Sequence, residues 1–269
     1  MLLRRSWTVL QKAVLMTVPA LRSASAGMTE AVTPFLAVEN LTKSFGGVHA
    51  VDGVDLTLAA GETRCIIGPN GCGKTTLFNL ITGYLLPSAG SVRFRGRIVS
   101  GRPLHAIAAE GLVRKFQVPS VFPALSVADN LAAARAATRR AADPAIVEEV
   151  IAGVGLREHL DTPAGTLAHG QKQWLELAMV LATGPSLVLL DEPAAGMTRA
   201  EKSATVQLIA DVRAKAGIAL LVIEHDMAFV EALNAPVSVM VMGKVVASGT
   251  FDQVRRDPLV RDAYLGGRA

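Results

Sequence analysis

The chain has 269 residues, of which 51% are hydrophobic, 4% aromatic and 19% charged, so it can form one large α/β domain with a mainly aliphatic core. The net charge of +4 does not indicate nucleic-acid binding, because residues 1–33 carry four basic side chains against one acidic side chain and leave only about +1 on the remainder. No uninterrupted apolar stretch approaches the roughly 18–20 residues that cross a bilayer, so we expect no membrane span.

Residues 1–33 are expected to be a disordered extension. Basic residues, the short apolar run 13–18 and small residues at 23–27 give this stretch a faint likeness to a secretory or transit peptide. Pro19 interrupts the apolar run. We therefore favour an extension from an upstream start codon, with Met28 as the true start, over a targeting or anchoring segment.

Short β-type segments follow from residue 36 onward. Strands are predicted at 36–39, 54–58, 63–67, 91–94 and 113–116. The glycine-rich residues 68–73 come directly after the third strand, and a helix is predicted at 74–81, ending at Gly83.

The glycine-rich loop has a motif for binding phosphate. Gly68-Pro69-Asn70-Gly71-Cys72-Gly73-Lys74-Thr75 fits G-x-x-x-x-G-K-[ST] at every fixed position. Glycines let backbone N–H groups turn toward phosphate oxygens, and the following helix adds its positive N-terminal end. Lys74 is predicted to reach the β- and γ-phosphates of ATP, and the Thr75 hydroxyl to ligate Mg²⁺, with Thr76 completing the nucleotide-binding set. The alternative is a coincidental glycine-rich turn.

The two cysteines of the chain, Cys65 and Cys72, lie in or beside this loop. Two are too few for a disulfide framework, so we expect reduced thiols in a cytosolic protein.

Beyond the fifth predicted strand the composition becomes alanine-rich and helical. A capping box at Ser126 and Asp129 opens one helix, Asp143-Pro144 opens another, and a third is predicted at 171–182. We interpret this stretch, about 119–182, as an inserted helical lobe.

An apolar strand at 187–190 ends in two acids, Asp191 and Glu192. The carboxyl end of such a strand is where α/β sheets bind their ligands. Asp191 is predicted to hold Mg²⁺, directly or through water, and Glu192 to orient and deprotonate the attacking water. Two solvated acids at a strand end are the alternative.

The last third of the chain continues the alternation of helix and strand. Predicted in order are a helix opened by the capping box Thr198/Glu201 and running to Ala216, an apolar strand at 218–223, and a hairpin of 237–242 and 244–247 about Gly243. This alternation predicts a mainly parallel sheet.

The phosphate loop and the Asp191-Glu192 strand end together resemble the ABC ATPases, and further segments match that family in order. Phe45 resembles the aromatic that stacks on adenine, with a core phenylalanine as the alternative. Gln117 resembles the Q-loop glutamine, which implies a role in sensing Mg²⁺ and the attacking water. His225, at the end of an apolar strand, resembles the switch histidine that bonds the γ-phosphate.

Leu167-Ala168-His169-Gly170-Gln171 occupies the place of the family's signature sequence, usually LSGGQ. The resemblance implies that residues 168–171, at a helix N-terminus, face the nucleotide of a second subunit. His169 replaces a glycine. Ala168 replaces the serine whose hydroxyl bonds the γ-phosphate, so one hydrogen bond of about 1.5–3 kcal/mol is missing. Residues 193–198 resemble the D-loop, which crosses the dimer interface.

The resemblance covers about residues 36–266 and implies an α/β P-loop NTPase fold. An ABC ATPase domain at 34–266 is expected to contain a mainly parallel core sheet, an antiparallel β subdomain and the inserted helical lobe. Implied cofactors are ATP and Mg²⁺. Implied partners are a second ABC ATPase subunit, in a heterodimer or a homodimer, two membrane permease subunits and, indirectly, a substrate-binding protein, at the cytoplasmic face of the inner (plasma) membrane. No nucleic-acid partner is expected.

Within the family, the branched-chain amino acid and urea uptake group is the most similar, on segments 45–47, 195–197, 223–227 and 264–266. Residues 169–176 with 195–198 are most similar to the urea-type ATP-binding subunit. We therefore expect an ATPase that energises import of urea or of branched-chain or related amino acids.

Three alternatives differ in class. A nucleotide-binding regulatory subunit with weak or no turnover is favoured by Ala168 and disfavoured by Glu192 and His225. A soluble ABC protein of DNA repair or translation resembles chains with tandem motor domains, coiled coils or zinc sites, which this sequence lacks. A P-loop kinase has no need for the signature and switch segments.

Overall fold

The computed structural model describes residues 33–115, 121–138 and 140–265, all within one compact unit that begins at Thr33. The predicted extension, apart from Thr33, lies outside the described residues, and so does Gln117. The division of the chain into an extension and one ATPase domain therefore stays a prediction.

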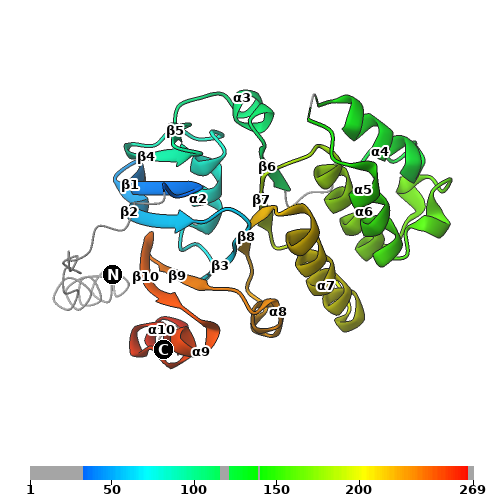
Figure 1. Cartoon of the computed structure of the whole chain (residues 1–269). Coiled ribbons are helices and arrows are strands. Elements are labelled where there is room, and N and C mark those ends of the chain that lie inside the picture. The colour runs from blue at the N-terminus through cyan, green and yellow to red at the C-terminus, as the bar shows by residue number, and fades with distance from the viewer. Residues whose placement is uncertain (1–32, 116–120, 139, 266–269) are drawn as a thin grey trace. The chain divides into compact units, whose positions relative to one another are not determined.

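A four-stranded antiparallel sheet begins the described fold (Figure 1). Its strands, in the order β2-β1-β4-β5, are β1 (Leu36–Phe45), β2 (Val48–Leu58), β4 (Ala89–Phe94) and β5 (Arg97–Ile98). Strands β1 and β2 are longer than predicted because β1 continues through the half-buried polar residues 42–44 to a tight turn, from which β2 begins. Gly46 and Gly47 both have positive φ, 51° and 87°, which suits a two-residue hairpin turn.

A six-stranded sheet, in the order β10-β9-β3-β8-β7-β6, forms the centre of the fold. Its strands are β3 (Thr63–Ile67), β6 (Leu112–Lys115), β7 (Leu187–Asp191), β8 (Ala219–Ile223), β9 (Val237–Val241) and β10 (Lys244–Gly249). All neighbours pair in parallel except β9 and β10, which form the predicted hairpin about Gly243. The mainly parallel core sheet and the antiparallel β subdomain are thus confirmed.

The helices occupy the segments between these strands. They are α2 (Lys74–Ile81), α3 (Leu104–Ala109), α4 (Val127–Ala136), α5 (Pro144–Gly153), α6 (His169–Ala182), α7 (Arg199–Ala216), α8 (Met227–Leu233), α9 (Phe251–Arg256) and α10 (Pro258–Leu265). Helices α4, α5 and α6 fall between β6 and β7 in the chain, where the inserted lobe was predicted. In the part of the chain that the structure describes, no helix has the length and apolar character needed to cross a bilayer.

The structure has helices at all three predicted capping sites, and two of the three caps have the predicted hydrogen bonds. Asp143 caps α5 by accepting a hydrogen bond from the N–H of Ala145, and Thr198 with Glu201 forms a full capping box on α7. Ser126 caps α4, but the prediction of a capping box there is wrong in one respect. The Ser126 hydroxyl donates to the Asp129 carboxylate at 2.7 Å, whereas a capping box would use the Ser126 N–H.

The central sheet separates two hydrophobic clusters, because side chains alternate along each strand. Leu189 and Leu221 pack in the cluster that includes α2 and the antiparallel sheet. Val188 and Leu220, one residue away, pack in the cluster that includes α6 and α7. With both faces covered, the polar groups of β7 and β8 that can meet a ligand lie at their carboxyl ends.

Truncating a buried side chain of β8 tests how much the packing of this sheet contributes to the free energy of unfolding. Leu221→Ala removes a fully buried side chain and is expected to cost about 2–5 kcal/mol of unfolding free energy. Leu86→Ala, at a side chain that is 61% exposed, is the matched control and is expected to cost far less. Equal losses for the two variants in denaturant unfolding would contradict this account of the core.

Candidate functional site

The phosphate loop connects β3 to α2, and two of its glycines are required by close backbone contacts. A Cβ on Gly68 would lie 2.2 Å from the carbonyl oxygen of Met240, and one on Gly73 would lie 2.1 Å from that of Ala50. A Cβ on Gly71, by contrast, would meet nothing within 4 Å. The loop is therefore held against the strands behind it and has an open side at Gly71, a cradle that suits a phosphate group.

Lys74 lies over this loop. Its Nζ donates to the carbonyl oxygens of Gly68 at 2.7 Å and Pro69 at 3.1 Å, and the residue is only 8% exposed. The first turn of α2 contains no acidic residue, and its N-cap, Gly73, supplies no side-chain acceptor. A cation and the N–H groups at a helix start thus converge on one loop, which favours an anion there.

Asp191 ends β7 and is 3% exposed. Its Oδ2 accepts a hydrogen bond from Arg114 Nη2 at 2.6 Å, and this guanidinium also donates to Asn79 of α2. Sequence reasoning missed Arg114. Arg114-Lys115 is a pair of basic residues inside a strand, and such a pair already signals buried acidic partners, because an unpaired buried charge is costly.

Lys115, the next residue of β6, contacts α6. Its Nζ lies 3.1 Å from Glu176 Oε2 and donates to Gln173 Oε1. The two basic residues therefore connect the strand that precedes Gln117 to the acidic end of β7 and to α6. Because each charge is buried with a partner, breaking either pair is expected to be costly.

Glu192 and His225 come together at the carboxyl ends of β7 and β8. The Nδ1 of His225 lies 3.5 Å from Glu192 Oε1 and 3.9 Å from Glu224 Oε2. Glu192 has the left-handed φ of 49°, and its N–H donates to the carbonyl oxygen of Ile223 at 2.9 Å. The predicted acid and the predicted switch histidine thus share one sheet edge, as their positions at strand ends indicated. Sequence reasoning did not single out Glu224, the buried residue that directly precedes His225.

The signature segment opens α6 two residues earlier than the predicted start at Gln171. Gln171 Oε1 accepts from the N–H of Ala168 at 3.0 Å, which is one half of a capping box, and the methyl side chain of Ala168 has no acceptor for the other half. The Nε2 of His169 lies 3.2 Å from the carbonyl oxygen of Ala195. A Cβ on Gly170 would lie 2.1 Å from the Glu201 carboxylate, so a larger residue there would displace this side chain.

The segment 168–171 therefore contacts the D-loop region of its own chain. A nucleotide contact by Ala168, His169, Gly170 or Gln171 stays a prediction.

Phe45 ends β1 and is 48% exposed, with Lys43 Nζ 5.1 Å from the centre of its ring. The alternative of a core phenylalanine is therefore wrong. Stacking on adenine stays a prediction, and an exposed ring is compatible with it.

Both cysteines are buried free thiols. Burial, with a smaller contribution from the Glu224 carboxylate, raises the pKa of Cys65 to about 12. Burial also raises the pKa of Cys72, against the opposing effect of the Lys74 ammonium group. Both therefore remain protonated near neutral pH and react slowly.

The residues present fit Mg²⁺ in the way that nucleotide-binding proteins hold it. Mg²⁺ commonly takes one or two protein oxygens, together with substrate phosphates and water. Thr75, exposed at the start of α2, and Asp191, at the end of β7, offer a hydroxyl and a carboxylate. Among the described residues, no cluster of three or more His, Cys, Asp or Glu side chains offers a complete protein cage for a metal.

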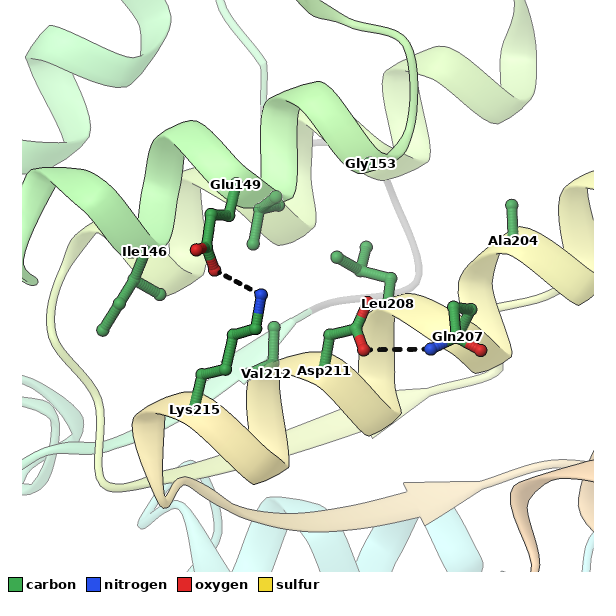
Figure 2. Close-up of a pocket in the computed structure, with 10 residues that line it drawn as sticks. Ile146, Glu149, Gly153, Ala204, Gln207, Leu208, Asp211, Val212 and Lys215 are labelled. Atoms are coloured by element: carbon green, nitrogen blue, oxygen red, sulfur yellow. Dashed lines mark hydrogen bonds and ion pairs between the residues drawn. The ribbon is translucent and has the colours of Figure 1, made fainter.

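A separate cavity of about 160 Å³ lies between α5 and α7 (Figure 2). Lys215 Nζ of α7 contacts Glu149 Oε2 of α5 at 2.8 Å across it, and this ion pair raises the pKa of Lys215. Val150 and Leu208 form part of its apolar wall. None of the predicted nucleotide-binding residues lines this cavity.

Comparison with known proteins agrees with this geometry. A family model described as ABC transporter matches residues 51–195, and one described as branched-chain amino acid ATP-binding cassette transporter matches residues 244–269. The chain is 38% identical over 250 residues to BraF of Pseudomonas aeruginosa, a high-affinity branched-chain amino acid transport ATP-binding protein, covering 87% of this chain and 98% of BraF. It is 37% identical to LivG of Escherichia coli K12, a protein of the same description, with the same coverage.

Among solved structures, the ADP conformation of MJ1267, an ATP-binding cassette of an ABC transporter, superposes with a TM-score of 0.77 at 30% identity. The superposition covers 87% of this chain and 99% of MJ1267.

Two glycine substitutions test the geometry of the phosphate loop. Gly71→Ala is expected to cost about 1–2 kcal/mol of unfolding free energy, from its left-handed backbone alone. Gly73→Ala adds a backbone clash and is expected to cost about 1–3 kcal/mol more. Thermal and denaturant unfolding measure the difference, and a Gly71→Ala variant as unstable as Gly73→Ala would contradict the described loop.

The carboxylate next to His225 provides a test by pH. Lys202, which donates to Asp226 at 2.5 Å, lowers the pKa of this carboxyl group below its ordinary value of 3.8, and the N–H groups at the start of α8 act in the same direction. Because the folded pKa is the lower one, the stabilisation is present above about pH 4 and is lost as the pH falls through the folded pKa.

Asp226→Asn is therefore expected to lower the melting temperature at pH 7 and to have a progressively smaller effect as the pH falls below about 4. Lys202→Met, which removes the partner, is expected to behave in the same way. A destabilisation by Asp226→Asn that is independent of pH would contradict the ionic origin.

Proposed function

The chain belongs to the ABC transporter family as an ATP-hydrolysing subunit, and we propose that it energises an importer for branched-chain amino acids or urea. The observation that carries the proposal is the meeting of the phosphate loop, Asp191, Glu192 and His225 at one edge of the parallel sheet. This edge unites an anion-binding loop, an oxygen donor for Mg²⁺ and a candidate general base.

Binding of ATP is assigned to the phosphate loop and to α2. The backbone N–H groups of residues 68 and 70–76 and the Lys74 ammonium group would hold the phosphates, with Phe45 against the adenine. Thr75 and Asp191 would hold Mg²⁺, which would neutralise phosphate charge when bound. The family resemblance adds Gln117 to this set. Arg114 holds the Asp191 carboxylate in place through its 2.6 Å contact.

Hydrolysis is assigned to Glu192 and His225. Glu192 accepts a proton from the attacking water, which is the usual role of a carboxylate beside a transferring phosphoryl group. His225, 3.5 Å from Glu192 and 59% exposed, is free to contact the γ-phosphate and to orient Glu192. The left-handed backbone at Glu192 is the kind of local strain that is found at active sites.

Transport requires partners. We propose a dimer in which residues 168–171 of one subunit face the nucleotide of the other, with two membrane permeases and a substrate-binding protein completing an importer at the cytoplasmic face of the membrane. Ala168 lacks the hydroxyl that would bond the γ-phosphate. In a heterodimer this loss affects one of the two sites, which favours pairing with a different ATPase subunit.

The proposed transported substrate rests on similarity alone, because the proposed roles of the site residues are toward nucleotide and not toward cargo. BraF and LivG, the relatives reported above, carry the description of branched-chain amino acid transport. The proposal of urea as the substrate rests on the resemblance of residues 169–176 and 195–198 to the urea-type ATP-binding subunit. Uptake assays with the co-expressed transporter, comparing labelled leucine with labelled urea, distinguish the two.

The second candidate function is a nucleotide-binding regulatory subunit. Ala168 is the observation that favours it. The approach of His225 to Glu192 disfavours it, because a subunit without turnover has no need to keep a base and a switch histidine together.

Glu192→Gln tests the proposed function. Removing the general base is expected to lower the rate of Mg-ATP hydrolysis by about 10²–10⁴-fold, with ATP affinity retained, in the full chain assembled with its transporter partners. Glu231→Gln, at an exposed position of α8, is the control. Tight ATP binding without Glu192-dependent turnover in any assembly would favour the regulatory subunit.

A further inference from the structure

We propose that Glu224 is a positioning residue, which fastens the loop after Glu192 to the segment that carries His225. The inference rests on the proposed roles of Glu192 and His225 in hydrolysis. It adds a buried residue that acts through these two.

The Glu224 carboxylate is buried and bonds to backbone on two sides. It is 1% exposed, directly after the last residue of β8. Its Oε1 accepts from the N–H of Ala194 at 3.0 Å. Its Oε2 accepts from the N–H groups of His225 at 3.0 Å and Asp226 at 3.3 Å. A buried carboxylate with both oxygens engaged is a fixed attachment point, because releasing it would leave a charge and several N–H donors without partners.

The two attachment points belong to the two segments that carry the proposed chemistry. Ala194 lies two residues after Glu192, in a turn where the N–H of Ala195 donates to the carbonyl oxygen of Glu192 at 3.1 Å. His225 is the residue that follows Glu224. One carboxylate therefore determines how far the turn after Glu192 lies from the backbone of His225.

Glu192 needs such support because its backbone is strained. A left-handed φ of 49° in a residue other than glycine persists only where surrounding contacts hold it. Two hydrogen bonds hold this backbone. The N–H of Glu192 donates to the carbonyl oxygen of Ile223, and the N–H of Ala194 donates to the Glu224 carboxylate. Loss of the hydrogen bond between Ala194 and Glu224 is expected to let the turn relax, so that Glu192 moves away from His225. Displacements of about 1 Å in a catalytic group can reduce a rate by about 10²-fold.

Both the charge and the two oxygens of Glu224 matter for this role. An amide of the same shape has one acceptor oxygen, and its NH₂ group would face N–H donors on the other side. Glu224→Gln therefore disconnects one segment while changing volume very little. Glu224→Asp keeps the carboxylate but shortens its reach, so it is expected to hold one segment better than the other.

The experiment measures ATP hydrolysis and ATP affinity for variants of the full chain assembled with its transporter partners. Glu224→Gln is expected to lower kcat by about 10–100-fold and to leave the Kd for ATP within about twofold, because the phosphate loop is built on other elements. Glu224→Asp is expected to lie between Glu224→Gln and the wild type. Glu62→Gln is the matched control. Glu62 also accepts from a backbone N–H, that of Ala59 at 2.8 Å, but it lies at the start of β3, whereas the phosphate loop follows the end of that strand.

A double-mutant cycle separates a positioning role from a structural one. If Glu224 acts through Glu192, adding Glu224→Gln to Glu192→Gln is expected to reduce the remaining rate by less than about threefold. Independent, multiplicative losses would overturn the proposal, and so would unfolding of both Glu224 variants at assay temperature, which would make Glu224 a structural residue only.

The outcomes also distinguish this inference from the proposed function. A normal kcat for Glu224→Gln, in an assembly where Glu192→Gln is inactive, would overturn the inference and leave the proposed function standing. Turnover that does not depend on Glu192 in the first place would overturn both.

Discussion

Parallel pairing of β7 with β8 places Asp191 beside Ile223, and the rest of the site depends on this register. Parallel strands end at the same edge of a sheet, so residues that follow each of them in the sequence meet in space. Asp191 and Glu192 follow one strand, Glu224 and His225 follow the next, and the phosphate loop follows β3 on the far side of β8. The edge therefore collects cation, carboxylates and imidazole from segments more than a hundred residues apart.

Buried charges connect this edge to the surrounding elements. Arg114 bonds Asp191, and Lys115 bonds Glu176 of α6. Glu224 bonds the backbone of the turn after Glu192 and that of the segment with His225. Each charge is costly to bury, so each is stable only with its partner in place. Such pairs fix the positions of the elements that they join. A shift of α6 or of the loop after β7 must therefore break these bonds or move the bonded partner as well. The mechanical coupling expected of a transport ATPase is consistent with this pattern.

Much of the fold could be predicted because the local signals were strong. Strand β3 and helices α2 and α7 have the predicted bounds, since glycines, capping residues and apolar runs mark their ends. Strands β1 and β2 extend further than predicted, because their outer halves lack a regular apolar alternation and gain their pairing from each other. Helix α8 has only seven residues, too few to show a clear period, and its cap, Asp226, is recognisable only from its contacts.

The sequence by itself determined the candidate groups of the site: the phosphate loop, the two acids after an apolar strand and the histidine after another can be recognised because each motif is local. The tertiary structure alone decided which groups support that chemistry. Arg114, Glu224 and the contact of His169 with Ala195 join residues that are 26 to 77 positions apart, and no local pattern encodes such distances. They arise from the order of strands in the sheet, which pattern and propensity leave open until the chain packs.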